Sequence, residues 1–379
     1  MKKIGILTFH KSINYGSVLQ CWALKDLLAS RGYSVEVIDY EPKAYNRLYG
    51  VYLKGKVKHN LNVAPVAKYI RRQQEGFAAF RNNTLNLSPE KYFYDSDLSL
   101  LDKYDVIVCG SDQIWNLAAD DCDPIYFLPV KTRGRKVAYA ISSNDTNYDE
   151  PEATDELRSW ILDFDYLSER EETGAEKLEK FLGYKKRVDT NLDPTLLHVK
   201  ADFDRIASSR IEKEPYIFLY NVWSGRDGFE AARRLSKRLH MPVYTGFMSR
   251  TFKGLIKAGV KGIRVEKNYT SPSDYLSLIK YADWVVTDSF HGTAFSLIFE
   301  KKFITVNSRN TDGSLKNDRR LLNILGEVGL ADRYIPVSEV DHFDLTKAID
   351  YGRVTSKRME VANESIGRLI NAIEGNLDS

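Results

Sequence analysis

A histidine lies directly behind a predicted buried strand, within residues 284–295 of the chain. The β-branched residues at 285–287 favour a strand, and Gly292 lets the backbone turn tightly into a helix predicted from about Thr293. In open α/β sheets, ligands bind at the carboxyl ends of strands, where helix N-termini offer N–H groups to anions. A lone histidine is more often structural, but this position favours a proton-transfer role for His291. The candidate residues here are His291, Ser289, Gly292 and Thr293.

Polar clusters also follow predicted strands in the first half of the chain. One closes the first strand–helix loop at 14–16, a second follows a strand at 106–109, a third begins at Ser142, and a fourth contains Arg170. Each has a structural alternative, either as a helix cap or, for Arg170 and Glu171, as a surface ion pair. The candidate binding residues in this half are Asn14, Tyr15, Gly16, Ser111, Asp112, Gln113, Trp115, Asn116, Ser142 and Arg170.

Length and composition restrict the class of protein. The chain has 379 residues, of which 43% are apolar and 28% charged, so a globular protein of two domains is predicted. A net charge of +3 does not argue for a nucleic-acid partner. The three cysteines lack metal-ligand spacing and do not resemble a secreted disulfide framework. We find no signal peptide and no apolar run of about twenty residues, and therefore expect a cytoplasmic protein.

Short apolar segments alternate with amphipathic ones, which predicts mostly parallel sheets flanked by helices. The first unit combines a strand at 3–8, a helix from about 17 to 30 and a strand at 35–40, and a second series begins at 216–220. The fold class is therefore α/β with two Rossmann-like domains. The expected domains are residues 1–198, residues 199–345 and a C-terminal helical tail at 346–379.

Residues 42–81 interrupt the first half with a cluster of Lys and Arg, among which Glu75 is the single acidic residue. One interpretation is a solvated helical insertion. The other is a surface for anionic lipid headgroups or a diphosphate-linked acceptor, because each basic side chain near a membrane contributes about 1 kcal/mol.

Taken together, the motifs resemble the bacterial polysaccharide pyruvyl transferase family over about residues 4 to 330. The matching segments are Asn14-Tyr15-Gly16 with Leu19-Gln20, the run 110–116, Tyr139-Ala140 with Ser142, Ser168-Glu169-Arg170-Glu171, the run 193–197 and the run 288–293. The resemblance implies a fold similar to GT-B glycosyltransferases, with the two domains facing a central cleft. The N-terminal domain would then be the acceptor side and the C-terminal domain the donor side.

The resemblance also implies a reaction. Pyruvate would pass from phosphoenolpyruvate to a sugar as a cyclic ketal, in the biosynthesis of an exopolysaccharide, capsule or other cell-surface polysaccharide. The implied partners are phosphoenolpyruvate and a glycan or lipid-linked oligosaccharide. Together with the basic segment 42–81, this leads us to expect peripheral contact at the inner face of the cell membrane. Neither a metal nor another cofactor is implied, and no nucleic acid is expected.

The chemistry gives the matching residues roles. Phosphoenolpyruvate is a trianion, so arginines would bind it, and its C3 must be protonated before C2 becomes electrophilic. His291 matches the family's general acid and Arg170 an arginine that resembles a donor ligand, while Asp112 is a candidate base by position. Many relatives have an arginine where this chain has Ser289. Arg320, or else Arg309, is expected to replace that cation.

Two alternatives remain at this point. A GT-B type nucleotide-sugar glycosyltransferase would use the same pair of domains, with Tyr220, Asn221 and Glu266 near the nucleotide. A catalytically lapsed glycan-binding protein would explain the absence of an arginine at Ser289.

Overall fold

A computed structural model describes residues 1–48, 66–143, 146, 148–149, 151–221, 226–246, 259 and 262–376. Residues 49–65 of the predicted basic insertion lie outside the described residues. The chain divides into two compact units. Unit 1 comprises Met1–Gly50, Arg81–His198 and Met359–Ser379, and unit 2 comprises Val51–Phe80 and Val199–Arg358.

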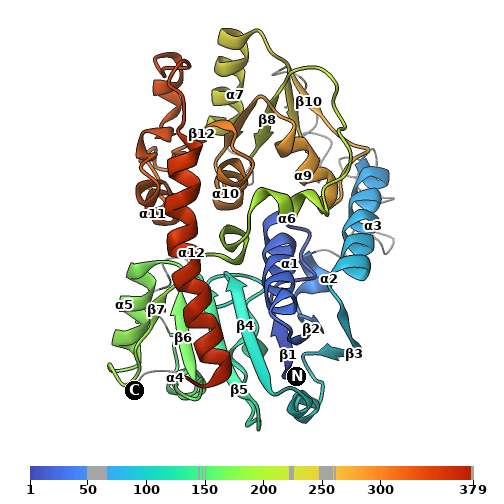
Figure 1. Ribbon diagram of the computed structural model, residues 1–379, viewed down its shortest axis with the longest axis vertical. Coiled ribbons are helices and arrows are strands. Elements are labelled where there is room, and N and C mark those ends of the chain that lie inside the picture. Colours follow the sequence, from blue (N-terminus) through green and yellow to red (C-terminus); the bar gives the residue numbers. More distant parts are fainter. Residues whose placement is uncertain are drawn as a thin grey trace. The chain divides into compact units, whose positions relative to one another are not determined.

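Unit 1 is built on a parallel sheet of seven described strands in the order β3-β2-β1-β4-β5-β6-β7 (Figure 1). The strands are β1 (Lys3–Leu7), β2 (Ser34–Glu41), β3 (Leu87–Phe93), β4 (Val106–Asp112), β5 (Arg135–Ile141), β6 (Tyr166–Glu169) and β7 (Asp189–Thr190). The helices and 3₁₀ turns are α1 (Tyr15–Ser30), α2 (Tyr45–Leu48), η4 (Leu98–Lys103), η5 (Pro124–Phe127), α4 (Asp155–Leu162), α5 (Glu172–Phe181) and η6 (Pro194–Leu197). Every residue of β4 is buried, as expected for a central strand covered on both faces.

Unit 2 has a second parallel sheet, with six described strands in the order β10-β9-β8-β11-β12-β13. The strands are β8 (Ile217–Tyr220), β9 (Val243–Thr245), β10 (Ile263–Val265), β11 (Trp284–Thr287), β12 (Lys302–Val306) and β13 (Tyr334–Ile335). The helices and 3₁₀ turns are α6 (Lys200–Asp204), α7 (Arg226–Leu239), α9 (Pro272–Lys280), α10 (Phe290–Ile298), α11 (Arg319–Glu327), η7 (Ala331–Arg333) and η8 (Val337–Asp341). Two parallel sheets, each covered by helices, confirm the predicted α/β class with two Rossmann-like domains.

Two helices contribute to both units. α3 (Ala67–Thr84) passes from unit 2 into unit 1 after Phe80, and α12 (Tyr351–Glu374) passes from unit 2 into unit 1 after Arg358. The sequence predicted a C-terminal helical tail at residues 346–379. The helix α12 covers most of this range and packs within both units, since an isolated helix buries too little apolar surface to be stable.

The order of the strands marks where ligands are expected. In unit 1 the order reverses between β1 and β4, and in unit 2 it reverses between β8 and β11. Open α/β sheets bind ligands beside the carboxyl ends of strands at such a switch point. The loops after β1, β4 and β11 carry most of the candidate residues, so the topology places each candidate set at a binding edge.

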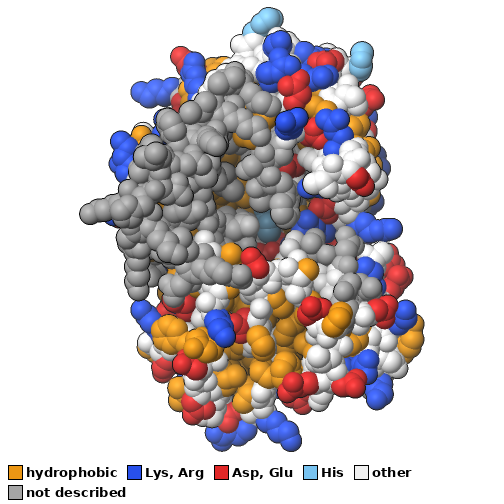
Figure 2. Space-filling model, turned by 180° about the vertical axis from the view of Figure 1, so that it is seen from behind, with side chains coloured by type: hydrophobic (Ala, Val, Ile, Leu, Met, Phe, Trp, Pro, Cys, Tyr) orange, Lys and Arg blue, Asp and Glu red, His pale blue; other side chains and the backbone are white. Residues whose placement is uncertain are grey.

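The described surface carries charges of both signs. Figure 2 shows Lys and Arg side chains interspersed with Asp and Glu over this face, in agreement with the nearly balanced composition. Among the described residues, no helix is long and apolar enough to cross a membrane.

Candidate functional site

The loop after β1 leads into α1, whose first turn contains three candidates. Asn14 is the N-cap: its Oδ1 accepts the N–H groups of Gly16 at 2.9 Å and Ser17 at 3.4 Å. Tyr15 and Gly16 are buried in the helix. α1 therefore begins before the predicted start near Ser17, because the asparagine caps it.

A buried network joins β1, α1 and the end of β4 through Gln20. Its Nε2 donates to Oγ1 of Thr8 at 2.9 Å, and its Oε1 accepts the N–H of Ser111 at 3.1 Å. The Thr8 hydroxyl donates to the carbonyl of Ser111 at 2.9 Å, and the Ser111 hydroxyl donates to the carbonyl of Ala140. Ser111 is thus held by contacts with Thr8, with Gln20 of α1 and with Ala140 of β5. The sequence analysis did not single out Thr8.

Asp112 and Arg170 meet beside this network. Asp112 has a φ of 74°, a left-handed conformation that is unusual for a non-glycine residue and recurs at functional sites. Nη2 of Arg170 lies 3.7 Å from Oδ1 of Asp112 and 2.7 Å from Oδ2 of Asp193, and its Nε donates to Oγ of Ser111 at 2.9 Å. The structure therefore brings Ser111, Asp112 and Arg170 together at one edge of the sheet.

The residues after Asp112 divide into two groups. Nδ2 of Asn116 donates to Oε1 of Gln113 at 3.2 Å, and both side chains are partly exposed. Trp115 is 1% exposed, donates from Nε1 to the carbonyl of Tyr126 at 2.9 Å and stacks on Phe127 with 5.1 Å between ring centroids. Trp115 was expected to bind substrate. Its indole is instead part of the hydrophobic core of unit 1, so we leave it out of the proposed site.

Ser142 lies beside the carboxyl groups of Glu169 and Glu171, which belong to the same sequence motif as Arg170. Its hydroxyl donates to Oε1 of Glu171 at 3.2 Å, and the N–H of Ser143 donates to Oε2 of Glu169 at 3.2 Å. Burial, together with the neighbouring charge of Glu171, raises the pKa of the Glu169 carboxyl well above its usual range. The two acids flanking Arg170 in the sequence were the available signal for this pair.

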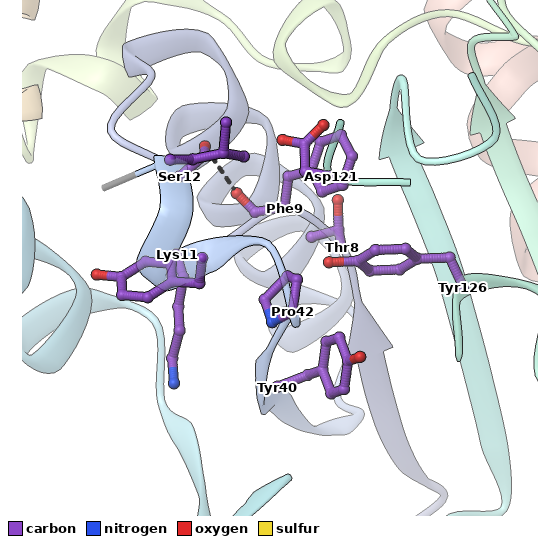
Figure 3. A pocket seen from close by; sticks show the side chains of 10 residues that line it. Thr8, Phe9, Lys11, Ser12, Tyr40, Pro42, Asp121 and Tyr126 are labelled. Carbon is purple, nitrogen blue, oxygen red and sulfur yellow. Dashed lines mark hydrogen bonds between the residues drawn. The ribbon is translucent and has the colours of Figure 1, made fainter. Parts of the chain in front are cut away.

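A small pocket lies beyond the ends of β1 and β2 in unit 1 (Figure 3). It is lined by Thr8, Phe9, Lys11, Ser12, Tyr40, Pro42, Tyr45, Leu48, Asp121 and Tyr126. Its volume of about 10 Å³ is room for one water molecule. A sugar ring is much larger, so we leave this pocket out of the proposed site.

In unit 2, α10 begins at Phe290 and places His291 in its first turn. The predicted start was Thr293. The helix begins earlier. The backbone carbonyl of Ser289, which is in extended conformation, accepts the N–H of Thr293 at 3.0 Å and its hydroxyl at 3.1 Å. His291 is 8% exposed, and its ring meets Phe290 edge-on with 5.3 Å between centroids.

Gly292 is the residue that lets α10 approach β11 closely. A Cβ at this position would lie 2.1 Å from Oγ1 of Thr287, and that hydroxyl already donates to the carbonyl of Tyr220 at 2.8 Å. Thr293 is buried, with its hydroxyl 2.9 Å from that of Thr305. Gly292 and Thr293 therefore set the position of His291 through packing.

Two arginines lie at the same edge of unit 2. The guanidinium of Arg320 binds the carboxylate of Asp318 through Nε at 3.0 Å and Nη2 at 2.6 Å. Although burial opposes it, this contact lowers the pKa of Asp318. Arg309 binds Asp227 through Nε at 3.2 Å and Nη2 at 2.7 Å, with 54% of its side chain exposed.

Arg320 lies closer to the segment of His291 than the sequence alone indicates. The hydroxyl of Tyr334 accepts the N–H of Asp318 at 2.9 Å. Burial raises the pKa of Tyr334 to about 12, and the charges of Asp318, Arg320 and Asp288 all act on it. The helix α11, which carries Arg320, packs against α10, which carries His291. Across the residues that the structure describes, no group of three His, Cys, Asp or Glu side chains could hold a metal ion.

A model of the polysaccharide pyruvyl transferase family matches residues 14–310 of the chain. The protein belongs to this family. A search of curated proteins returned no match.

Solved structures show which fold this member of the family has. A UDP-GlcNAc 2-epimerase from Methanocaldococcus jannaschii aligns with a TM-score of 0.53 at 14% identity, covering 98% of this chain and 99% of that one. MnaA from S. aureus, solved with UDP, aligns with a TM-score of 0.53 at 12% identity, covering 99% and 97%. At such identities the likeness shows the fold alone, which is GT-B-like.

The candidate site residues differ in whether they lie within the segment that the family model matches. The unit 1 candidates and the run from Ser289 to Thr293 lie within residues 14–310, as does Arg309. Arg320 lies outside it. The two possible replacements for the missing arginine thus differ in their support: Arg309 lies within the matched segment, whereas Arg320 lies near the segment of His291 in the structure.

Proposed function

We propose that this pyruvyl transferase forms a cyclic ketal from phosphoenolpyruvate and two hydroxyl groups of a sugar. C3 of the donor takes a proton and becomes a methyl group. One hydroxyl oxygen then adds to C2, and the second displaces phosphate from C2. Of the two hydroxyl protons, one balances the proton gained by C3 and the other leaves with the phosphate as hydrogen phosphate. The observation that carries the proposal is the family match, within which His291 occupies the first turn of α10.

His291 is the proposed general acid for C3. An imidazolium has a pKa near neutral pH, so it can give up a proton at the working pH. Support comes from its position directly after β11, at the switch point of unit 2, and from Gly292, whose close approach to Thr287 fixes the helix that carries it. The N-terminus of α10 also favours an anionic donor.

The donor carboxylate and phosphate need cations, and we propose Arg320 for this role. Only 13% of its side chain is exposed, and Asp318 holds its guanidinium through two contacts. A guanidinium can bind a carboxylate or phosphate through two parallel N–H groups, which suits the two anionic groups of the donor. Ser289 then contributes a hydroxyl where many relatives are expected to have an arginine.

Asp112 is the proposed base for an acceptor hydroxyl, with Asn14, Gln113, Asn116 and Ser142 as further polar groups at the edge of unit 1. The acceptor class is a glycan or lipid-linked oligosaccharide.

We propose that no cofactor is needed and that the protein acts in the cytoplasm. We also propose that three exposed residues of α3 contribute to peripheral contact with anionic lipid, namely Lys68, Arg71 and Arg72.

Phosphate release tests the reaction. The purified protein is incubated with phosphoenolpyruvate and a panel of nitrophenyl and lipid-linked galactosides, mannosides and N-acetylhexosaminides. Release that depends on one acceptor, together with a product heavier by one pyruvyl ketal in mass spectrometry, supports the proposal. If the His291→Asn variant keeps full activity, His291 is not the general acid.

A nucleotide-sugar enzyme is the second candidate, motivated by the UDP bound in the S. aureus structure. Calorimetric titration separates the two, because a pyruvyl transferase binds phosphoenolpyruvate and not a UDP-sugar. Tight binding of a UDP-sugar without any binding of phosphoenolpyruvate would replace the first proposal by the second. Binding of a glycan without turnover of either donor would indicate a lapsed enzyme.

A further inference from the structure

The small pocket at the carboxyl edge of unit 1 is too narrow for a sugar ring, but it has the size of a single substituent of such a ring. All the residues that line it belong to unit 1. Its volume of about 10 Å³ admits one water molecule, and a methyl group is only slightly larger than water (Figure 3). The pocket therefore matches one methyl group in size.

Three aromatic side chains form an apolar wall of this pocket. They come from the loop after β1, from β2 and from η5, and all three are buried. Phe9 meets the ring of Tyr126 edge-on with 5.2 Å between centroids, and Tyr40 meets the same ring edge-on at 5.8 Å. Because the rings pack on one another, the wall is already formed before a ligand binds.

Several polar side chains of the lining are engaged within the protein. The hydroxyls of Ser12 and Thr8 donate to backbone carbonyls at 3.1 and 2.9 Å, and Nζ of Lys11 lies 2.9 Å from the carboxylate of Asp39. These contacts use both hydroxyl protons and hold the ammonium against another carboxylate. A water that finds fewer than about two polar partners is held weakly, and an apolar group displaces such a water with a gain in affinity. The lining thus favours a methyl group.

The pocket lies beside the turn that carries the proposed base. The hydroxyl of Thr8, which lines the pocket, donates to the carbonyl of Ser111, and Asp112 follows directly. In the sheet, β1 lies between β2 and β4. Neighbouring strands are roughly 5 Å apart, so the ends of β1 and β2 lie roughly 5 to 10 Å from the end of β4. A sugar ring spans such a distance, and a ring with one hydroxyl at Asp112 therefore reaches the pocket with a substituent.

We propose that this pocket binds a methyl group of the acceptor sugar, either the acetamido methyl of an N-acetylhexosamine or the C6 methyl of a 6-deoxyhexose. The inference rests on the proposed function, because it places the sugar beside Asp112. It narrows the acceptor from glycans in general to those that carry a methyl-bearing sugar. The carboxylate of Asp121 also lines the pocket, where it can accept the N–H of an acetamido group.

Acceptor binding tests the inference without turnover. Calorimetry measures the Kd of two series of nitrophenyl glycosides. The first compares N-formyl, N-acetyl and N-propionyl hexosaminides, and the second compares each 6-deoxyhexoside with its parent hexoside. In one series we expect the methyl-bearing compound to bind at least about tenfold more tightly than the compound without the methyl group, since one carbon in an apolar pocket changes affinity about 10- to 200-fold. The N-propionyl compound should bind no better than the N-acetyl compound.

The two series identify the source of the methyl group. A gain in the first series assigns the pocket to the acetamido methyl, and a gain in the second assigns it to the C6 methyl. Equal affinities within both series, or no binding in either, would overturn the inference.

A widened pocket provides a second test. Phe9→Leu removes part of the aromatic wall and should reduce the preference for the methyl-bearing glycoside from about tenfold to less than about threefold. Phe181→Leu is the matched control, because Phe181 is as buried as Phe9, belongs to the same core and stacks on Tyr148. The control should keep the preference of the wild type, and thermal denaturation shows whether both variants fold. A folded Phe9→Leu variant with an unchanged preference would contradict the role of the pocket.

A crystal structure of the wild type with the glycoside that binds most tightly separates this inference from the proposed function. We expect the methyl group in contact with Phe9 and Tyr126. A methyl group bound elsewhere would overturn the inference, whatever the reaction is. A protein that binds the methyl group in this pocket but releases no phosphate from phosphoenolpyruvate refutes the proposed function and leaves the assignment of the pocket in place.

Discussion

The side chain of Arg170 at the carboxyl edge of unit 1 is 3% exposed, whereas that of Arg309 at the same edge of unit 2 is 54% exposed. The first is enclosed by Asp112, Asp193 and Ser111, and the second contacts Asp227 from the surface. Two sheets of the same topology therefore place an arginine in two different electrostatic environments. In unit 1 two carboxylates lie beside the guanidinium of Arg170, whereas in unit 2 Arg309 and Arg320 each pair with one carboxylate.

The largest expected effect concerns the acid of unit 2. His291→Asn should lower kcat about 1,000-fold, because it removes the proton donor for C3 while keeping a side chain of similar polarity. Initial rates of phosphate release at saturating donor measure it. His342→Asn, which alters a histidine on the C-terminal side of η8, is the control and should keep full activity. Equal loss in both variants would contradict the assignment.

The base of unit 1 should matter less. Asp112→Asn should lower kcat about 100-fold with the Kd for phosphoenolpyruvate unchanged, since the carboxylate acts on the acceptor. Single-turnover kinetics and calorimetry measure the two quantities. If Asp112→Asn instead weakens the binding of phosphoenolpyruvate, Asp112 contacts the donor, as His291 is proposed to do. The two units would then not act on different substrates.

The two arginines of unit 2 provide a finer comparison. Arg320→Ala should raise the KM for phosphoenolpyruvate about tenfold, because a charge-assisted contact is lost. Arg309→Ala should change it less than about twofold, since the side chain of Arg309 is 54% exposed and its guanidinium is held by buried Asp227. Steady-state kinetics decide between them. If Arg309→Ala instead raises the KM more than Arg320→Ala does, Arg309 would be the cation that replaces the arginine expected at position 289. Arg309 lies within the segment that the family model matches.

Packing beneath His291 predicts a loss of stability. Gly292→Ala introduces a Cβ at 2.1 Å from Oγ1 of Thr287 and should cost about 1–3 kcal/mol in the free energy of unfolding. Gly326→Ala on α11 is the control, because a Cβ there meets nothing within 4 Å, and it should stabilise by about 1 kcal/mol or less. Urea denaturation measures both. Equal stability of the two variants would show that α10 can move away from β11.

The smallest effect concerns Glu169 in unit 1. Burial raises the pKa of its carboxyl in the folded state, so the native protein binds more protons than the unfolded chain and loses stability as pH rises above the usual value for glutamate. Glu169→Gln resembles the protonated acid and should be no more stable than wild type near pH 4, but increasingly more stable toward pH 8. Thermal denaturation across this range measures the difference. A difference independent of pH would contradict the raised pKa.

The sequence was sufficient for the fold class, because alternating apolar strands and amphipathic helices have distinct periodicities. It also placed Asp112, Ser142 and His291 at the ends of strands, and the topology brings Asp112 and Ser142 to the carboxyl edge of the unit 1 sheet and His291 to that of the unit 2 sheet. The burial of Trp115 and Arg170 was not predictable. Both depend on which side chains from distant segments, such as Tyr126 and Asp193, surround them. The start of α10 was missed because the close packing of Gly292 against Thr287, which places the first turn of the helix, is a tertiary feature.

The division of the chain has a consequence for its synthesis. Unit 1 begins at Met1, yet it also includes Met359–Ser379, which follows the whole of unit 2 in chain order. Nζ of Lys2 donates to the carbonyl of Ile373 at 3.0 Å, and the hydroxyl of Tyr33 donates to Glu374 at 2.7 Å. During translation, the unit that emerges first from the ribosome is therefore the last to receive all its parts. A nascent chain halted before residue 359 would hold a finished unit 2 beside an unfinished unit 1.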